Sequence, residues 1–209
     1  MKPRIKICCI GSDEEATKAI HFGASAIGLV GKMPSGPGPI ADELIASIIK
    51  KVPPPIATFL LTSETTAENI IAHQQRVHSN TIQIVDAVKD SNYRLIRDTI
   101  PLIKIVQVIH VIDEDSVNEA VELSCYVDAL LLDSGNPKLA VKELGGTGRI
   151  HNWQLSKKIV EQSKVPVFLA GGLNAENVKR AIEEVQPFGI DVCSGVRTDG
   201  NLNEEKLEA

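Results

Sequence analysis

Eight short runs of apolar, mostly β-branched residues recur along the chain, about 26 residues apart on average. The runs are nearly continuous rather than alternating, which predicts strands that are buried on both faces. The segments between them carry apolar residues at the spacing of a helix stripe. The runs span residues 4–10, 25–30, 55–61, 81–85, 102–111, 128–132, 165–170 and 188–193.

Signals for helix ends stand between the runs. Ser12 and Glu15 form a capping-box pattern, and Gly23 offers the left-handed position that ends a helix. Residues 64–77 carry an apolar stripe, and Asn174 is a candidate cap for the helix that follows it. The repeating unit is therefore a strand, a loop and a helix.

The number of units decides between two parallel-sheet folds. Eight strand–helix units without a break in composition predict a single-domain α/β protein, a (β/α)₈ TIM barrel over residues 1–209. The alternative is an open doubly wound sheet, which usually has about five to seven strands. The barrel would be near the minimal length of its fold, and residues 201–209 leave room for only a short last helix.

The charge and the apolar pattern argue against several classes of function. With 22 Lys and Arg against 27 Asp and Glu, the net charge is −5, which does not indicate a nucleic-acid-binding surface. No apolar run approaches the roughly 18 residues of a membrane span, and the N-terminal run is too short for a signal peptide. The four cysteines, at positions 8, 9, 125 and 193, lack the spacing of metal ligands. We therefore expect a cytoplasmic protein without a metal and without nucleic-acid or membrane partners.

Two side chains at predicted strand ends are candidates for acid–base chemistry. Cys8 lies near the end of the first run and shares a strand face with Lys6, so its thiol could point into the mouth of the barrel. Such a thiol is either a base or nucleophile with a lowered pKa, or a small buried apolar group. Asp133 follows four apolar residues and precedes a loop, which is typical of either a general acid or base or a turn residue.

Glycine-rich turns follow the last three predicted strands, at 145–148, 171–172 and 193–197. Such turns after the seventh and eighth strands form the phosphate site of many (β/α)₈ barrels. Backbone amides and a helix N-terminus can receive a dianion there. The pattern therefore predicts a phosphorylated small molecule as the ligand.

Six motifs follow one another along nearly the whole chain: KIC at 6–8, GASAIG at 23–28, LLLD at 130–133, GGTG with a later Trp at 145–153, GGLNAENV at 171–178 and DVCSGV at 191–196. In this order they give a close resemblance to the phosphoribosylanthranilate isomerase family of tryptophan biosynthesis.

The resemblance implies an Amadori-type isomerisation of an N-linked aminoaldose phosphate to an aminoketose phosphate, without metal or cofactor. It implies that Asp133 is the general acid that protonates the furanose ring oxygen, and that Cys8, as a thiolate, is the general base that removes the C2′ proton. The partner is then the phosphorylated sugar substrate, and the protein is a monomer or a homodimer. The phosphate would be held by Gly146, Gly171, Gly172, Ser194 and Gly195.

The chain departs from the family pattern around the aglycone. Cys9 stands where the family has glycine, and residues 33–40 contain none of the basic residues with which the family binds the anthranilate carboxylate. Arg149 or Arg197 could replace that clamp or lie on the surface, and His110 could line the pocket or cap its strand. The substrate pocket is predicted to contain Gln83, Asp86, His110, Arg149 and Arg197.

Three functions stay open. The first is the isomerisation of phosphoribosylanthranilate. The second is an isomerase or lyase reaction on a different phosphorylated sugar, which residues 33–40 and Asp86 favour; the third is non-catalytic binding of a phosphorylated metabolite. Because the first and last strands of a closed barrel are neighbours, we also expect Cys193 to lie near Cys8, either as a redox-sensitive pair or as a filler in the phosphate turn.

Overall fold

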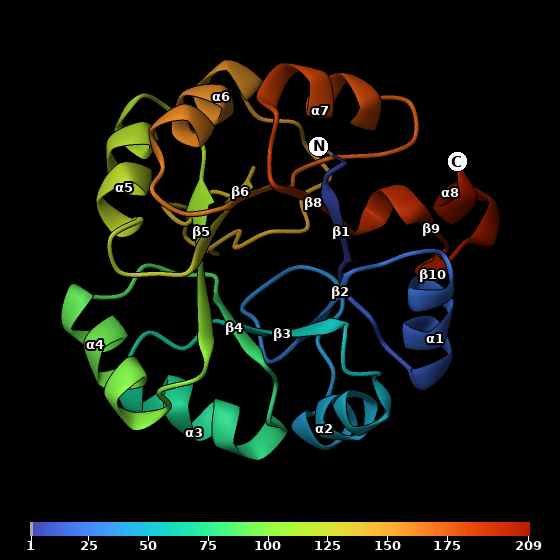
Figure 1. The fold of residues 1–209 in the computed structure, drawn as a ribbon, viewed down its shortest axis with the longest axis horizontal. Helices are drawn as coiled ribbons and strands as arrows, with labels where there is room; N and C mark the ends of the chain where they lie inside the picture. The colour runs from blue at the N-terminus through green and yellow to red at the C-terminus, as the bar shows by residue number, and fades with distance from the viewer. Residues whose placement is uncertain (1) are drawn as a thin grey trace.

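Residues 2–209, which the computed structural model describes, form a closed barrel of eight parallel strands in chain order (Figure 1). The strands are β1 (Arg4–Ile7), β2 (Ala26–Val30), β3 (Ala57–Thr62), β4 (Thr81–Ile84), β5 (Lys104–His110), β6 (Ala129–Asp133), β7 (Val167–Leu169) and β8 (Gly189–Val192). Because β1 pairs with both β2 and β8, this sheet has no free edge. The predicted (β/α)₈ TIM barrel is confirmed, and the open sheet is wrong.

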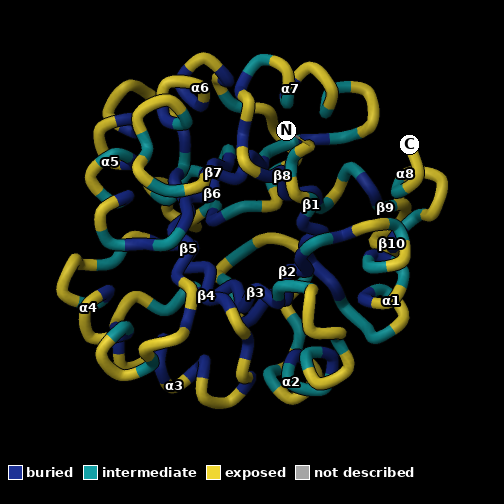
Figure 2. The backbone as a smooth tube through the Cα atoms, in the orientation of Figure 1, coloured by how far each residue is buried: buried dark blue, intermediate teal, exposed yellow. Residues whose placement is uncertain are grey.

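A ring of helices surrounds the barrel, with exposed outer faces and a buried interior (Figure 2). The helices are α1 (Asp13–His21), α2 (Asp42–Lys51), α3 (Ala67–Val77), α4 (Asp90–Thr99), α5 (Asp115–Leu123), α6 (Trp153–Gln162), α7 (Val178–Val185) and α8 (Glu204–Glu208). The last helix is short, as predicted; it follows the 3₁₀ turn η1 (Ser194–Val196) and the antiparallel pair β9 (Arg197–Thr198) and β10 (Asn201–Leu202). No helix within residues 2–209 is long and apolar enough to cross a membrane.

Local hydrogen bonds explain where α1 and α7 begin. Ser12 Oγ accepts from the Glu15 amide at 3.2 Å, so the predicted cap of α1 is confirmed. The prediction for Asn174 is wrong, because α7 begins only at Val178. The Asn174 side chain accepts from the amides two and three residues ahead, and it therefore closes a turn that precedes the helix.

The barrel interior is filled by aliphatic side chains and two phenylalanines. Phe59 and Phe168 pack edge to face, with ring centroids 5.9 Å apart. A second apolar layer lies between the strands and the helices. The interior also holds an ion pair: Lys6 Nζ is 2.9 Å from Asp191 Oδ1, and the two residues are in register across β1 and β8. The barrel interior is therefore mainly apolar, and this ion pair is buried in it beside Phe59.

Candidate active site

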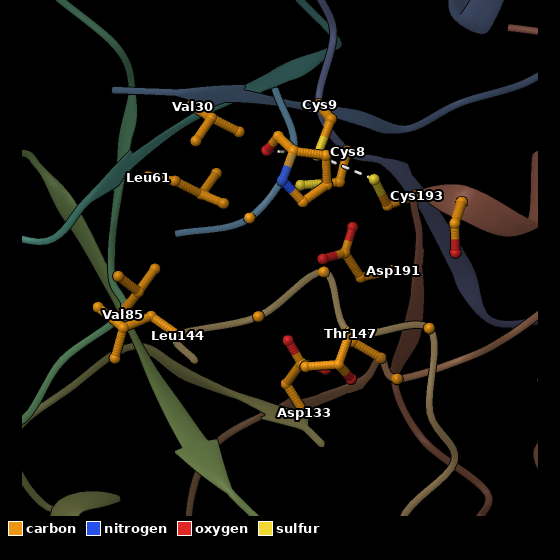
Figure 3. A pocket seen from close by; sticks show the side chains of 18 of the residues that line it. Cys8, Cys9, Val30, Leu61, Val85, Asp133, Leu144, Thr147, Asp191 and Cys193 are labelled. Carbon is orange, nitrogen blue, oxygen red and sulfur yellow. Dashed lines mark hydrogen bonds between the residues drawn. The ribbon is translucent and has the colours of Figure 1, made fainter. Parts of the chain in front are cut away.

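A cavity opens at the carboxyl ends of the strands, where the loops after β1, β2, β6, β7 and β8 meet (Figure 3). The residues that line it surround about 720 Å³ of space, part of which is open to solvent. In the view of Figure 3, Asp191 lies between the thiols of Cys8 and Cys193 on one side and Asp133 on the other. Polar groups from three strands therefore converge on one cavity.

Asp133 is the last residue of β6, and its buried carboxyl group lines the cavity. Its Oδ1 accepts from the Ser134 amide at 2.7 Å. Burial raises the pKa of Asp133 above its ordinary value despite that amide, and the Asp191 carboxylate raises it further. A carboxyl group that keeps its proton to higher pH can act as a general acid.

Cys8 follows β1, and its amide donates to Val192 O at 2.8 Å, which extends the pairing with β8. The side chain is buried and lines the cavity. Gly28 leaves room for the thiol, since a methyl group on Gly28 would lie 2.8 Å from Cys8 Sγ. The thiol and the Asp133 carboxyl group thus reach the cavity from β1 and β6, which are not neighbouring strands.

The glycine-rich turns lie together at the cavity. The residues predicted to hold a phosphate that line it are Gly146, Gly171, Gly172 and Ser194. Gly195 does not line the cavity; it supports the turns, because a methyl group there would lie 1.9 Å from Leu173 O. Only glycine therefore lets the turns after β7 and β8 approach this closely.

Two loops meet over the cavity. Residues 33–40, between β2 and α2, contact residues 134–150, between β6 and α6, because Ser35 Oγ donates to Lys142 O at 2.6 Å. The first loop adds apolar wall to the cavity through Met33 and the residues near it. Of the described residues that line the cavity, none is Lys or Arg. The loop therefore contributes shape rather than positive charge.

Of the predicted pocket residues, Gln83 lines the cavity, and Asp86 and His110 do not. Asp86 turns toward Lys142, whose Nζ lies 2.5 Å from its Oδ2. The His110 ring contacts Val85 O through Nε2 at 3.0 Å, which ties the end of β5 to the end of β4. Neither side chain lines the cavity, because Asp86 pairs with Lys142 and His110 contacts the Val85 carbonyl group.

Neither predicted arginine reaches the cavity. Arg149 is exposed and pairs with Glu143 in the same loop. Arg197 Nη1 lies 2.7 Å from Glu15 Oε1, and its Nη2 donates to Cys9 O at 2.6 Å. The Arg197 guanidinium thus fastens the turn after β8 to α1 and to the end of β1. The expectation that one of them replaces the carboxylate clamp is corrected, since both are held elsewhere.

Asp191 and Cys9 line the cavity, although the predicted site omits them. Asp191 carries the same signal as Asp133, an acid inside an otherwise apolar strand. Cys9 adopts the left-handed conformation, with φ of +61°, at the position where the family has glycine. Its Sγ is 2.9 Å from Cys193 Sγ, so the thiol beside Cys193 belongs to Cys9 and not, as expected, to Cys8.

A buried thiol, a buried carboxyl group with a raised pKa and glycine-rich turns at the carboxyl ends of a (β/α)₈ barrel are typical of enzymes that act on phosphorylated small molecules. The family model described as N-(5'phosphoribosyl)anthranilate (PRA) isomerase matches residues 5–209. The chain belongs to the N-(5'-phosphoribosyl)anthranilate isomerase family.

Known members of this family are similar over nearly their whole length. N-(5'-phosphoribosyl)anthranilate isomerase 2 of Methanosarcina mazei is 38% identical, and the match covers 97% of this chain and 89% of that protein. The crystal structure of phosphoribosyl anthranilate isomerase from Thermotoga maritima superposes with a TM-score of 0.84 at 27% identity, covering 99% and 96%. A structure of the isomerase in complex with reduced 1-(o-carboxyphenylamino)-1-deoxyribulose 5-phosphate has a TM-score of 0.81 at 25% identity, covering 99% and 95%.

Proposed function

We propose that this protein isomerises N-(5'-phosphoribosyl)anthranilate, the aldose-to-ketose conversion for which its family is named. The observation that carries the proposal is the meeting of Cys8 and Asp133 at one cavity that the glycine-rich turns also line. The related isomerase that holds a reduced carboxyphenylamino-deoxyribulose phosphate supports the same class of ligand.

The reaction needs a proton donor and a proton acceptor at different atoms of one sugar. Asp133 donates its proton to the furanose ring oxygen, which opens the ring and leaves an iminium ion at C1′. Cys8, as a thiolate, then removes the proton from C2′, and the electron pair of that bond forms the enolamine. Tautomerisation of the enolamine gives the ketone. Cys8 and Asp133 line the same cavity, which is the arrangement that this pair of proton transfers on one bound sugar needs.

The aglycone faces an apolar wall in this proposal. Val30, Leu61, Val85 and Leu144 line the cavity, and in Figure 3 they lie on the opposite side from Cys193. Such a wall fits the anthranilate ring, while its carboxylate finds no lysine or arginine among the described lining residues. That missing cation favours the second candidate function, isomerisation or cleavage of another phosphorylated sugar with a neutral aglycone.

Fluorescence provides the test. Freshly made phosphoribosylanthranilate is mixed with the protein, and the decay of its anthranilate fluorescence is followed against a Cys8→Ala/Asp133→Ala control. Turnover that the control lacks, together with rescue of a tryptophan auxotroph, is the expected result. Binding of the substrate without turnover would support the non-catalytic alternative. Turnover of another sugar phosphate alone would support the second candidate.

A further inference from the structure

Lys6 is a fully buried cation directly behind the candidate base. It lies on β1, two residues before Cys8, so both side chains point to the same face of the strand. Its Nζ is 2.9 Å from Asp191 Oδ1 and 5.2 Å from the centroid of the Phe59 ring. The contact with Asp191 is an ion pair without a well-aligned hydrogen bond, and Nζ has no other hydrogen-bond partner within residues 2–209.

The ammonium group and the thiol border the same small space. A methyl group on Gly28 would lie 3.0 Å from Lys6 Nζ and 2.8 Å from Cys8 Sγ. Burial by itself lowers the pKa of Lys6, but the facing Asp191 and Cys8 raise it above its ordinary value. Lys6 is therefore a cation at neutral pH, and a cation beside a thiol in a water-poor interior favours the thiolate.

We propose that Lys6 is a positioning residue that stabilises the Cys8 thiolate, and that Asp191 limits this effect as the counter-ion of Lys6. The catalytic meaning of this assignment rests on the proposed function, in which Cys8 is the base. The other titratable groups that line the same cavity are Asp133 from β6 and the thiols of Cys9 and Cys193. Arg197 Nη2 lies 3.4 Å from Cys8 O.

Removing the charge of Lys6 and removing the charge of Asp191 are expected to shift the thiol–thiolate equilibrium of Cys8 in opposite directions. Without the Lys6 cation the thiolate loses its partner, so Lys6→Met disfavours it. Without the Asp191 anion the cation acts on the thiolate alone, so Asp191→Asn favours it. If the pair only supported the barrel, both substitutions would disturb the site in the same way.

The pH dependence of alkylation by iodoacetamide measures the thiolate without any substrate. The full chain is used with Cys9→Gly, which removes the adjacent thiol, and Cys8 labelling is followed by mass spectrometry. The exposed Cys125 serves as internal control. Lys6→Met should raise the midpoint of the pH dependence of Cys8 alkylation by at least about one pH unit, and it should slow Cys8 labelling at pH 7 about tenfold. Asp191→Asn should lower the midpoint, and Cys125 labelling should not change.

An unchanged midpoint in Lys6→Met, or a shift of the same sign in both variants, would overturn the proposal. If Lys6→Met does not fold, Lys6→Met/Asp191→Asn replaces it; its midpoint should then exceed that of Asp191→Asn, and equality overturns the proposal. The readout is independent of turnover. A parent protein that shows these shifts but does not isomerise phosphoribosylanthranilate would refute the proposed function and leave the role of Lys6 intact.

A second observation concerns the paired thiols of Cys9 and Cys193. Both are free cysteines, their Sγ atoms are 2.9 Å apart, and they follow β1 and β8, which pair directly. Adjacent strands lie about 4.8 Å apart, which is within the reach of a disulfide. Cys9 also has a left-handed backbone conformation, which is strained for a residue with a side chain, so placing a thiol at this position costs backbone conformational energy.

We infer that Cys9 and Cys193 can form a disulfide that links the first strand of the barrel to the last. The two thiols lose two protons and two electrons, which a low-molecular-weight disulfide accepts as it is reduced to two thiols. The bond would close nearly the whole chain into one loop, so the unfolded state loses much of its freedom.

Oxidised glutathione is the probe for this pair. Treated protein should lose two hydrogens in mass, yield a Cys9–Cys193 peptide pair, and unfold about 10 °C higher than reduced protein. Cys193→Ser should show neither the cross-link nor the shift, and reduction should reverse both. A cross-link between Cys8 and Cys193, or no cross-link at equilibrium, would overturn the inference.

Discussion

The α-carbon of Gly145 lies against the carboxyl group of Asp133, so that a methyl group on it would be 2.7 Å from Oδ2. Gly145 also has a φ of +142°, which residues with side chains rarely adopt. We expect Gly145→Ala to displace the acid or the loop that covers it and to lower kcat at least about tenfold, because small misplacements of catalytic groups are costly. Steady-state kinetics with phosphoribosylanthranilate measure the effect.

Gly200→Ala is the matched control for backbone strain. Gly200 has a φ of +81°, lies outside the cavity, and leaves open space where a methyl group would stand. This variant should lose about 1 kcal/mol of stability while kcat stays near that of the parent. An equal loss of kcat in both variants would attribute the effect to strain rather than to contact with Asp133.

Cys8→Ala and Asp133→Ala should each lower kcat at least about a hundredfold, which is the lower range for acid–base groups. The reason is that each removes one of the two proton-transfer groups of the proposed reaction. Cys125→Ala, which removes an exposed thiol, is the control and should leave turnover unchanged. Near-normal turnover in either cavity variant would remove that residue from the mechanism.

The raised pKa of Asp133 should also appear in the pH dependence of stability. The unfolded carboxyl group titrates near pH 3.9, and the folded one above it, so the folded protein holds an extra proton in between. The free energy of unfolding should therefore fall, relative to Asp133→Asn, as pH rises from about 4 through the folded pKa. Urea unfolding of both proteins between pH 4 and 8 measures this difference, and parallel curves would contradict it.

The two arginines that the sequence predicts at the substrate should differ sharply in their contribution to stability. Arg197 has a side chain that is 11% exposed and joins Glu15 to backbone carbonyls, so Arg197→Ala leaves buried groups unpaired and should cost about 2–4 kcal/mol. Arg149 has a side chain that is 57% exposed, and Arg149→Ala should cost less than about 1 kcal/mol. Thermal unfolding compares them. A higher KM for Arg149→Ala without a change in stability would indicate that Arg149 contacts the substrate.

The barrel could be predicted from sequence because strands covered on both faces need continuous apolar runs. The same physics marks Asp133, since an acid at the end of such a run needs a special environment. It also marks Lys6 and Asp191, whose charges lie within strands of the barrel. Their pairing depends on the register between β1 and β8, which local sequence patterns do not specify.

The rim of the cavity could not be predicted in the same way. Asp86 is turned aside by Lys142, which is distant in the chain and lies on a loop with no secondary-structure signal. His110 ends a strand as predicted, but its ring is held by the neighbouring strand rather than by the cavity. Local patterns indicate which side chains stand at strand ends, whereas the loops that compete for them are set by long-range contacts.

The register between Lys6 and Asp191 also constrains how the molecule is assembled. One charge is on the first strand and the other on the last, so each meets its counter-ion only when β8 docks beside β1. A barrel that enclosed Lys6 before that step would bury a lone cation at a cost of several kcal/mol. The pairing of the Lys6 charge with Asp191 and the closure of the barrel by β8 therefore occur in the same step. A chain that ends before β8 lacks both the strand that closes the barrel and the carboxylate that pairs with Lys6, so closing the barrel and pairing this charge depend on the same late segment of the sequence.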